Sequence, residues 1–303
     1  MMEEKDLLKK KQHYVPQVYL RGFSPEYEPL NKSELPFEKY TIFPFDLEKQ
    51  AYDSTEAVPI HSVCYKKKLY EIYGTDDQII FPNWLENYFC ALEKMYGSYR
   101  TELERKVHRE SIGVPNILTT MEKTFWVTFI AIHLLRNAYA LSEAEAAIKE
   151  LVNDSVSDKE VKSAVRKLCL PFFQEIKEDS QETKILEGIL APMYQMQFAV
   201  GIDFDNQLIT SDKGASIIGK EFPTDEYDEV IFPITSAICL ILLGNENKDV
   251  YQDNTLFELT EAGKKHITSN VVLDAYKRIY SNHRFSIDEK RFIKEIATER
   301  ITY

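Results

Sequence analysis

The sequence predicts an α+β protein that is predominantly helical, with a small antiparallel or mixed sheet built from strands near 39–73 and 194–259. Within those two segments, apolar residues alternate with polar ones, as in half-buried strands. The stretches between and after them repeat apolar residues every three or four positions, as in amphipathic helices. The order of strands, helices, strands and helices also differs from the regular strand–helix alternation of a parallel sheet.

We expect one compact domain over residues 1–303. A strand and helix part would occupy 1–115, central helices 116–193, and a sheet with helices 194–303. The length suits a single large domain with ample material for a core.

The composition is that of an ordinary globular protein. Apolar residues at 44% and charged residues at 28% argue against disorder. The net charge of −12 argues against a surface that coats nucleic acid nonspecifically, because such binding neutralises many phosphates, but it leaves room for a small basic pocket. The cysteines form no C-x-x-C pair, the N-terminus has no signal-peptide pattern, and no apolar run is long enough to span a bilayer. We therefore expect a cytoplasmic protein with reduced thiols and no membrane partner.

The first third of the chain combines short strands with one long helix. KYTIFPFD at 39–46 alternates, and QAYDS at 50–54 follows after a polar turn, which predicts a hairpin. LYEIY at 69–73 would add a strand. Residues 82–109 place their apolar side chains on one helical face, and Pro82 suits the first turn of that helix.

The middle of the chain is predicted to be helical. A helix over 117–141 is apolar nearly all round, which is typical of a central core helix. A second helix would begin at Ser142, whose side chain suits the cap position. Segments 157–168 and 180–193 continue in the same manner.

The last third returns to a period of two and then to helix. Segments 194–205 and 208–214 predict a hairpin, and 228–244 predicts two strands joined near residues 235–236. Segments 260–282 and 286–299 predict two helices.

The segment HYVPQVYLRGF, from His13 to Phe23, is the first candidate functional feature. Pro16 would occupy the first helical position, so His13 and Tyr14 enter just before the helix. Gln17 and Arg21, four residues apart, share the polar face. The free N–H groups of the helix start would suit an anion, with His13 and Arg21 adding charge or a proton. Alternatively, this is the polar edge of a docked helix, with His13 bonded to the backbone.

Two further basic features allow two interpretations each. YKKKLY at 65–70 is the densest basic cluster and would form either a solvated turn or a contact to a phosphate-bearing partner. HLLR places His133 and Arg136 one turn apart on the most apolar helix. A buried arginine must be paired or face a cavity, so Arg136 would form a structural salt bridge or grip an anion.

LITSDKG places Ser211, Asp212 and Lys213 at the end of a predicted strand. An aspartate there, followed by a basic residue, suits a divalent metal such as Mg²⁺ beside a phosphate, with Asp203 and Asp205 as candidate second carboxylates. The same letters also describe an ordinary turn. The usual phosphate-loop, dinucleotide, zinc-protease and nucleophile-elbow motifs do not occur in the sequence.

Taken in order, these segments resemble the bacterial family catalogued as domain of unknown function 4238. That family opens with H-Y-V-P-Q-x-Y-L-x-x-F, which matches residues 13–23, and continues with a short strand pair and an aromatic element, here residues 69–70. The later matches are Leu85-Glu86, Leu92-Glu93, Arg136, LITSDKG, the Phe-Pro segment at 232–236 and the helix at 275–281. The resemblance covers nearly the whole chain.

The chain departs from the family pattern at two points. The usual S-D-N-P is Ser211-Asp212-Lys213-Gly214 here, so a rigid proline turn is lost. Asn137 follows the arginine, where the family often has Thr-Pro. The resemblance implies no defined activity. Members of the family look like products of accessory bacterial genes, and some of these genes occur among phage-defence or toxin-like genes.

Two classes of function fit these features. The first is an enzyme acting on a phosphodiester or nucleotide, of the defence or toxin nuclease type, with unknown cofactors or a divalent metal such as Mg²⁺. It would use His13 as proton shuttle, Arg136 as phosphate clamp and Asp212 as metal ligand or orienter. Its substrate contacts would come from Tyr14, Gln17, Arg21 and Ser211.

The second class is a noncatalytic protein-interaction or sensor module, in which the opening segment docks structurally and a protein partner binds aromatic-rich helices. The two hypotheses differ in one geometric expectation. The enzyme requires His13, Arg136 and Asp212 to converge on one concave site, whereas the binding module has them dispersed and each satisfied locally.

Overall fold

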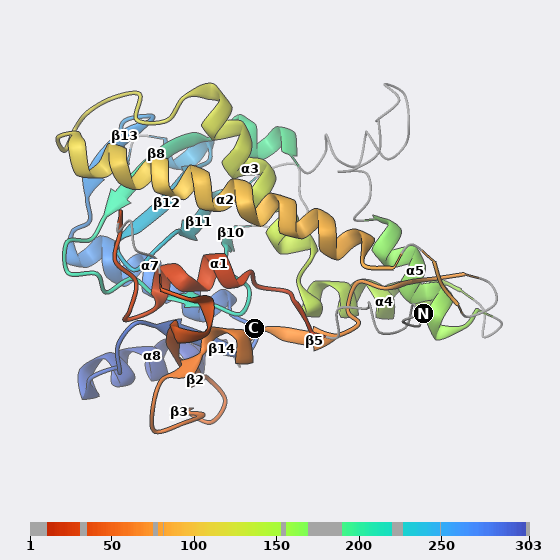
Figure 1. Ribbon diagram of the computed structural model, residues 1–303. Helices are drawn as coiled ribbons and strands as arrows, with labels where there is room; N and C mark the ends of the chain where they lie inside the picture. The colour runs from red at the N-terminus through yellow and green to blue at the C-terminus, as the bar shows by residue number, and fades with distance from the viewer. Residues whose placement is uncertain are drawn as a thin grey trace.

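The computed structural model describes residues 11–30, 35–74, 78–80, 82–152, 156–168, 190–219, 227–248 and 250–300. These residues form a mixed α+β protein, in which the long helix α2 crosses in front of a sheet and a second sheet lies below it in the view of Figure 1. In the described part of the chain, no helix combines the length and apolar character needed to span a membrane.

The first five-stranded sheet has the order β10-β11-β12-β8-β13. Its strands are β10 (Ser216–Ile218), β11 (Glu229–Pro233), β12 (Ile238–Leu243), β8 (Gln197–Ile202) and β13 (Thr255–Glu258). All neighbours are antiparallel except β13 and β8. Every residue of β11 and β12 is buried, as their apolar sequence predicts for strands covered on both faces.

The second five-stranded sheet has the order β3-β2-β14-β9, and β4 also pairs with β2. Its strands are β3 (Ala51–Tyr52), β2 (Thr41–Asp46), β14 (Arg278–Ser281), β9 (Thr210–Ser211) and β4 (Val58–Pro59). Two small ribbons pair β1 (Lys11–His13) with β5 (Tyr65–Lys67), and β6 (Ile72–Tyr73) with β7 (Ile79–Ile80). The predicted α+β class is confirmed. The protein is not predominantly helical, and the predicted strand regions divide between separate sheets in place of one small sheet.

The described helices pack around these sheets. They are α1 (Gln17–Leu20), α2 (Trp84–Arg109), α3 (Thr120–Leu135), α4 (Ala138–Leu151), α5 (Asp158–Leu168), α7 (Glu261–Asp274) and α8 (Ile287–Glu299). Short 3-10 turns occur at Arg21–Phe23, Phe37–Lys39, Ile60–Ser62 and Asn245–Asn247.

Several predicted elements are confirmed. The β2–β3 hairpin forms as its alternation predicts, and β11 and β12 form the strand pair predicted over 228–244. Helix α2 spans most of predicted residues 82–109, and α5 lies within 157–168. Ser286 begins α8 with a capping box, in which its hydroxyl accepts from the amide of Glu289 and the Glu289 carboxylate accepts from the amide of Ser286.

The single helix predicted over 117–141 is wrong. The chain forms α3 and α4, separated at Arg136 and Asn137. Asn137 is the cap of α4, since its side chain accepts a hydrogen bond from the amide of Tyr139, and Ser142 lies inside the helix. The boundary between α3 and α4 could not be recognised from the sequence, because apolar residues occur on all sides of this stretch and the helical pattern does not shift at the boundary.

The predicted hairpin over 194–214 is also wrong, because β8 and β9 belong to different sheets. Helix α7 ends at Asp274, and Arg278–Ser281 forms strand β14 in place of the predicted helix continuation. Most of the helix predicted over 180–193 lies outside the described residues.

An aromatic cluster fixes α1 against α2, α3 and β11. Tyr19 is fully buried, stacks on Phe232 with ring centroids 5.2 Å apart, and contacts Tyr96 at 6.0 Å. The backbone approaches closely at Gly22, where an added Cβ would lie 2.8 Å from the backbone oxygen of Ile234. Figure 1 shows α1 directly below α2, so the opening segment is held at the centre of the molecule.

Candidate functional site

The opening segment, residues 13–23, buries its apolar side chains in the core and has polar residues at the surface. His13 ends β1 and pairs with Tyr65 of β5, and α1 then begins at Gln17. Pro16 is the cap residue with ψ 137°, so the expectation that it takes the first helical position is wrong. The side chains of Tyr14, Val15, Tyr19, Leu20 and Phe23 are buried. Because α1 has only four residues, the anion-facing helix start expected from the sequence receives little support from the helix dipole.

Both ring nitrogens of His13 are bonded within the protein. Nε2 donates to the backbone oxygen of His61 at 3.3 Å, and Gln17 donates from its side-chain amide to Nδ1 at 3.2 Å. Burial lowers the pKa of His13 to about 4, and the positive charge of Arg136 adds to the shift, although the bond to His61 opposes it. His13 is therefore neutral at pH 7.

Arg136 directs its guanidinium inward. One nitrogen donates to Glu93 Oε1 at 3.0 Å, and another donates to the backbone oxygen of His13 at 2.6 Å. Nε donates to the Tyr70 hydroxyl at 3.3 Å, and the guanidinium lies 4.1 Å from the centre of the Phe89 ring. The side chain is 3% exposed, so the arrangement corresponds to the structural salt bridge among the two interpretations of HLLR.

Asp212 is occupied by backbone donors. Its carboxylate accepts hydrogen bonds of 2.8, 2.8 and 3.0 Å from the amides of Tyr276, Lys277 and Arg278. Burial raises the pKa of Asp212 to about 6, even though these three N–H groups favour the charged form. The aspartate thus attaches the end of β9 to the start of β14.

The neighbours of Asp212 also make local contacts. Ser211 Oγ accepts from the amides of Lys213 and Gly214 at 3.2 Å, as in an ordinary turn, and Lys213 pairs with Asp274. The Thr210 hydroxyl bonds the Tyr19 hydroxyl at 2.6 Å.

The predicted metal ligands do not gather around Asp212. Asp203 and Asp205 both pair with Lys264 of α7. Over the residues that the structure describes, no group of three or more His, Cys, Asp or Glu side chains is arranged to hold a metal ion.

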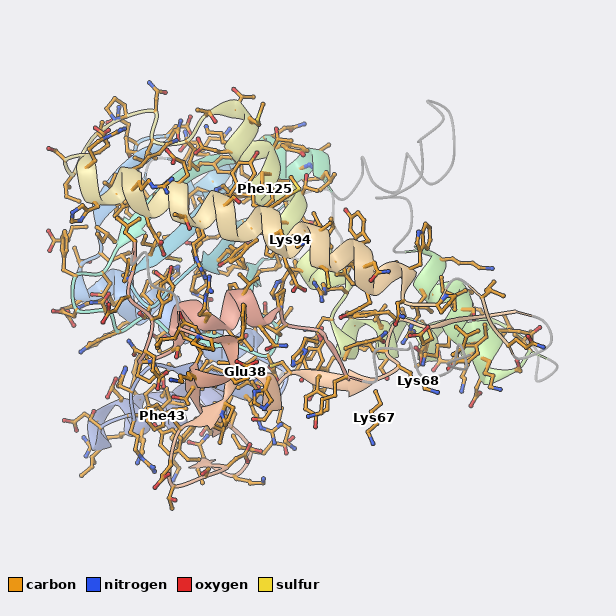
Figure 2. The ribbon with its side chains drawn as sticks, in the orientation of Figure 1. Glu38, Phe43, Lys67, Lys68, Lys94 and Phe125 are labelled. Atoms are coloured by element: carbon orange, nitrogen blue, oxygen red, sulfur yellow. The ribbon has the colours of Figure 1, made fainter. Side chains whose placement is uncertain are left out.

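Two adjoining hollows follow the α1 side of α2. The histidine hollow, of about 400 Å³, is lined by Lys11, His13, Gln17, His61, Glu86 and Glu93. The arginine hollow, of about 620 Å³, is lined by Val18, Arg21, Phe37, Lys94, Thr101 and Arg105. Cys90 and Glu93 line both. Figure 2 shows Lys94 on the middle of α2, where the second hollow lies.

The predicted site residues divide between these places. His13 and Gln17 line the histidine hollow, and Arg21 lines the arginine hollow with its guanidinium 5.2 Å from the Phe37 ring centre. Tyr14 is buried, which raises its pKa above the usual value. The carboxylate of Asp212 faces β14, so the three expected catalytic residues do not converge on one concave surface.

Sequence reasoning gave no site role to His61, Glu86 and Glu93, which are among the residues that line the histidine hollow. The two glutamates are seven residues apart, or two helical turns, and so share a face of α2. That spacing was a usable signal. His61 arrives from a separate 3-10 turn, and no pattern in the sequence connects it to His13.

Comparison with known protein families gave a match over most of the chain. The model of the family described as Protein of unknown function (DUF4238) matches residues 11–285. Neither the curated proteins nor the solved structures contained a match to the chain. The matched range includes both hollows and every site residue considered above.

Proposed function

Because the chain belongs to the DUF4238 family, a family of unknown function, we propose its function from the geometry of its own residues: it is a noncatalytic binding protein whose hollows along α2 receive a ligand or partner. One observation carries this proposal. His13, Arg136 and Asp212 each direct their polar atoms to other parts of the same protein.

The chemistry of each group supports the proposal. A general base works best with a pKa near the working pH, whereas His13 has a pKa of about 4 and both nitrogens bonded. A phosphate clamp must aim donors at the ligand, whereas the donors of Arg136 reach Glu93 and the main chain. The acceptor atoms of Asp212 are bonded to three amides.

An enzyme acting on a phosphodiester or nucleotide, of the defence or toxin nuclease type, is the second candidate. It is favoured by the histidine hollow, where His13, His61 and Glu86 border one space. Hydrogen bonds of catalytic groups often rearrange when substrate binds, so the bonds of His13 are compatible with this candidate as well.

The test compares purified wild-type protein with His13→Ala and His61→Ala. Each is incubated with end-labelled single-stranded and double-stranded DNA, single-stranded RNA and nucleoside triphosphates, with Mg²⁺ or Mn²⁺, and the products are separated by denaturing gel and chromatography. The binding proposal expects every probe to remain intact. Cleavage by the wild type that both variants lose, at unchanged urea unfolding midpoints, would establish the second candidate in its place.

The same comparison is informative in cells. On induction of the wild type and of His13→Ala, the binding proposal expects intact total RNA and DNA from both cultures. Fragmented nucleic acid in the wild-type culture alone would again favour the enzyme.

A further inference from the structure

The β1–β5 ribbon collects positive charge that the sequence distributes over two segments. Lys11 of β1 lies directly opposite Lys67 of β5, and His13 lies directly opposite Tyr65. Since side chains alternate along a strand, these four residues share one face of the ribbon, which we call the lysine face. Figure 2 shows Lys67 pointing away from the ribbon on the outside of the molecule.

Among the described residues, the lysines of this ribbon form no ion pair with a carboxylate. They are Lys11, Lys66 and Lys67, and the same is true of the neighbouring Lys68 and Lys162.

The arrangement also has a cost. Like charges directly opposite each other in a strand pair are destabilising, and Lys11 and Lys67 are such a pair. Lys162 of α5 adds to the charge, because its ammonium donates to the backbone oxygen of Lys68 at 2.9 Å. A negatively charged ligand would remove this repulsion.

Aromatic rings alternate with the lysines. The ammonium of Lys11 lies 4.4 Å from the centre of the half-buried Tyr65 ring, and the His13 ring lies 5.7 Å from Tyr65. On the other face of the ribbon, Lys66 lies 5.4 Å from the ring centre of Tyr139. Cations that follow a backbone, with rings on which unpaired bases stack, are the elements of single-strand recognition.

We propose that the lysine face binds single-stranded nucleic acid, with phosphates on Lys11 and Lys67 and a base on Tyr65, and that the strand continues toward the histidine hollow. Lys11 and His13 belong to both surfaces, so the ribbon leads directly into the hollow. This inference rests on the proposed binding function and names its ligand.

The net charge of −12 is compatible with such a site. At physiological ionic strength, charges farther apart than a Debye length of about 8 Å are largely screened, so the local lysines dominate the field at the ribbon. A duplex would place phosphates on the lysines but hide its base faces from Tyr65, and so we expect it to bind more weakly.

The experiment measures fluorescence anisotropy of labelled 15-nucleotide oligo-dT and oligo-rU at several salt concentrations. Lys11→Ala/Lys67→Ala is compared with Lys265→Ala/Lys294→Ala, an equal change of charge at exposed lysines on α7 and α8. The first pair should weaken binding about 10-fold or more at 0.1 M salt and reduce the slope of log K against log salt by about 1.4, as expected for two lost phosphate contacts. The second pair should bind like the wild type.

Substitutions of Tyr65 test the stacking. Tyr65→Phe should retain affinity and Tyr65→Leu should lose it, at unchanged unfolding midpoints. Equal weakening by the two lysine pairs, equal affinity for a duplex, or preferential binding to phosphatidylserine vesicles would each overturn the inference.

The outcomes also separate this inference from the proposed function. Binding with cleavage of the probe would retain the lysine face and refute the noncatalytic function. No binding at 50 mM salt, with the probe intact, would refute the lysine face and leave the noncatalytic function standing.

Discussion

The side chain of Asn137 bonds to the backbone of Asp212. Its Nδ2 donates a 2.7 Å hydrogen bond to the Asp212 backbone oxygen, and its Oδ1 accepts from the amide of Tyr139 at 3.0 Å. Both residues are buried. This bond joins the start of α4 to the turn that follows β9.

Asn137→Ala should therefore remove two interactions at once. Loss of the helix cap costs about 1 kcal/mol, and leaving the Asp212 oxygen buried without its donor costs about 1–3 kcal/mol more, so we expect unfolding free energy to fall by about 2–4 kcal/mol. Urea denaturation measures this change. Thr260→Ala, which removes only the cap of α7, is the matched control and should cost about 1 kcal/mol. Equal losses from both variants would contradict a stabilising role for the bond to Asp212.

Local signals predicted the elements that are defined by neighbouring residues. The patterns in 39–46 and 228–244 gave β2, β11 and β12, and the helical pattern of 286–299 gave α8. Elements defined by distant partners were missed. Strand β9 has two residues and exists because β14 pairs with it, and no sequence pattern records that pairing.

The candidate site was only partly predictable for the same reason. HYVPQ identified His13 and Gln17 as polar residues near a surface, and they line a hollow. Burial of Arg136 was visible from its apolar helix, but its partner Glu93 lies 43 residues earlier, on another helix. An aspartate at a strand end is a common metal ligand, so the sequence suggested that role for Asp212. Only the fold shows that its carboxylate accepts hydrogen bonds from backbone amides in the β14 region.

Gly214 occupies a position that a side chain cannot share. Its φ is +85°, and an added Cβ would lie 2.1 Å from Nε2 of His133. Proline, with φ fixed near −65°, could not adopt this conformation. The glycine and the buried histidine of α3 therefore depend on each other.

Gly214→Ala should be much more destabilising than Gly113→Ala. Gly113 has a similar φ of +87° but no atom within 4 Å of an added Cβ, so its substitution isolates the cost of the backbone conformation, about 1–2 kcal/mol. We expect Gly214→Ala to cost at least about 2 kcal/mol more, because the clash with His133 requires packed groups to move.

A double-mutant cycle with His133→Ala locates the origin of the difference. Removing the imidazole should make Gly214→Ala cost about as much as Gly113→Ala, which corresponds to a coupling of about 2 kcal/mol between the two positions. Additive effects would show that the strain at Gly214 does not come from His133.

The imidazole of His133 should make stability depend on pH. Both ring nitrogens are buried without a hydrogen-bond partner among the described residues, and the ring lies 5.1 Å from that of Tyr19. Burial lowers the pKa of His133 from 6.5 to about 3, and the charge of Arg136 adds to this shift. Between these values the unfolded chain binds the proton and the folded chain does not, so stability is complete above pH 6.5 and falls as the solution is acidified.

His133→Leu removes that contribution and leaves a side chain suited to the apolar site. From pH 6 to pH 4, its unfolding free energy should fall less steeply than that of the wild type, by about 1.4 kcal/mol per pH unit. The raised pKa of Asp212, about 6 against 3.8, acts in the opposite direction, but it is present in both proteins and cancels in the comparison. His108→Leu, which removes an exposed imidazole on α2, is the control for the loss of one imidazole from the chain. Parallel pH profiles for the wild type and His133→Leu would mean that the His133 imidazole is protonated equally in the folded and unfolded chains, against its burial among Tyr19, Phe129 and Phe232.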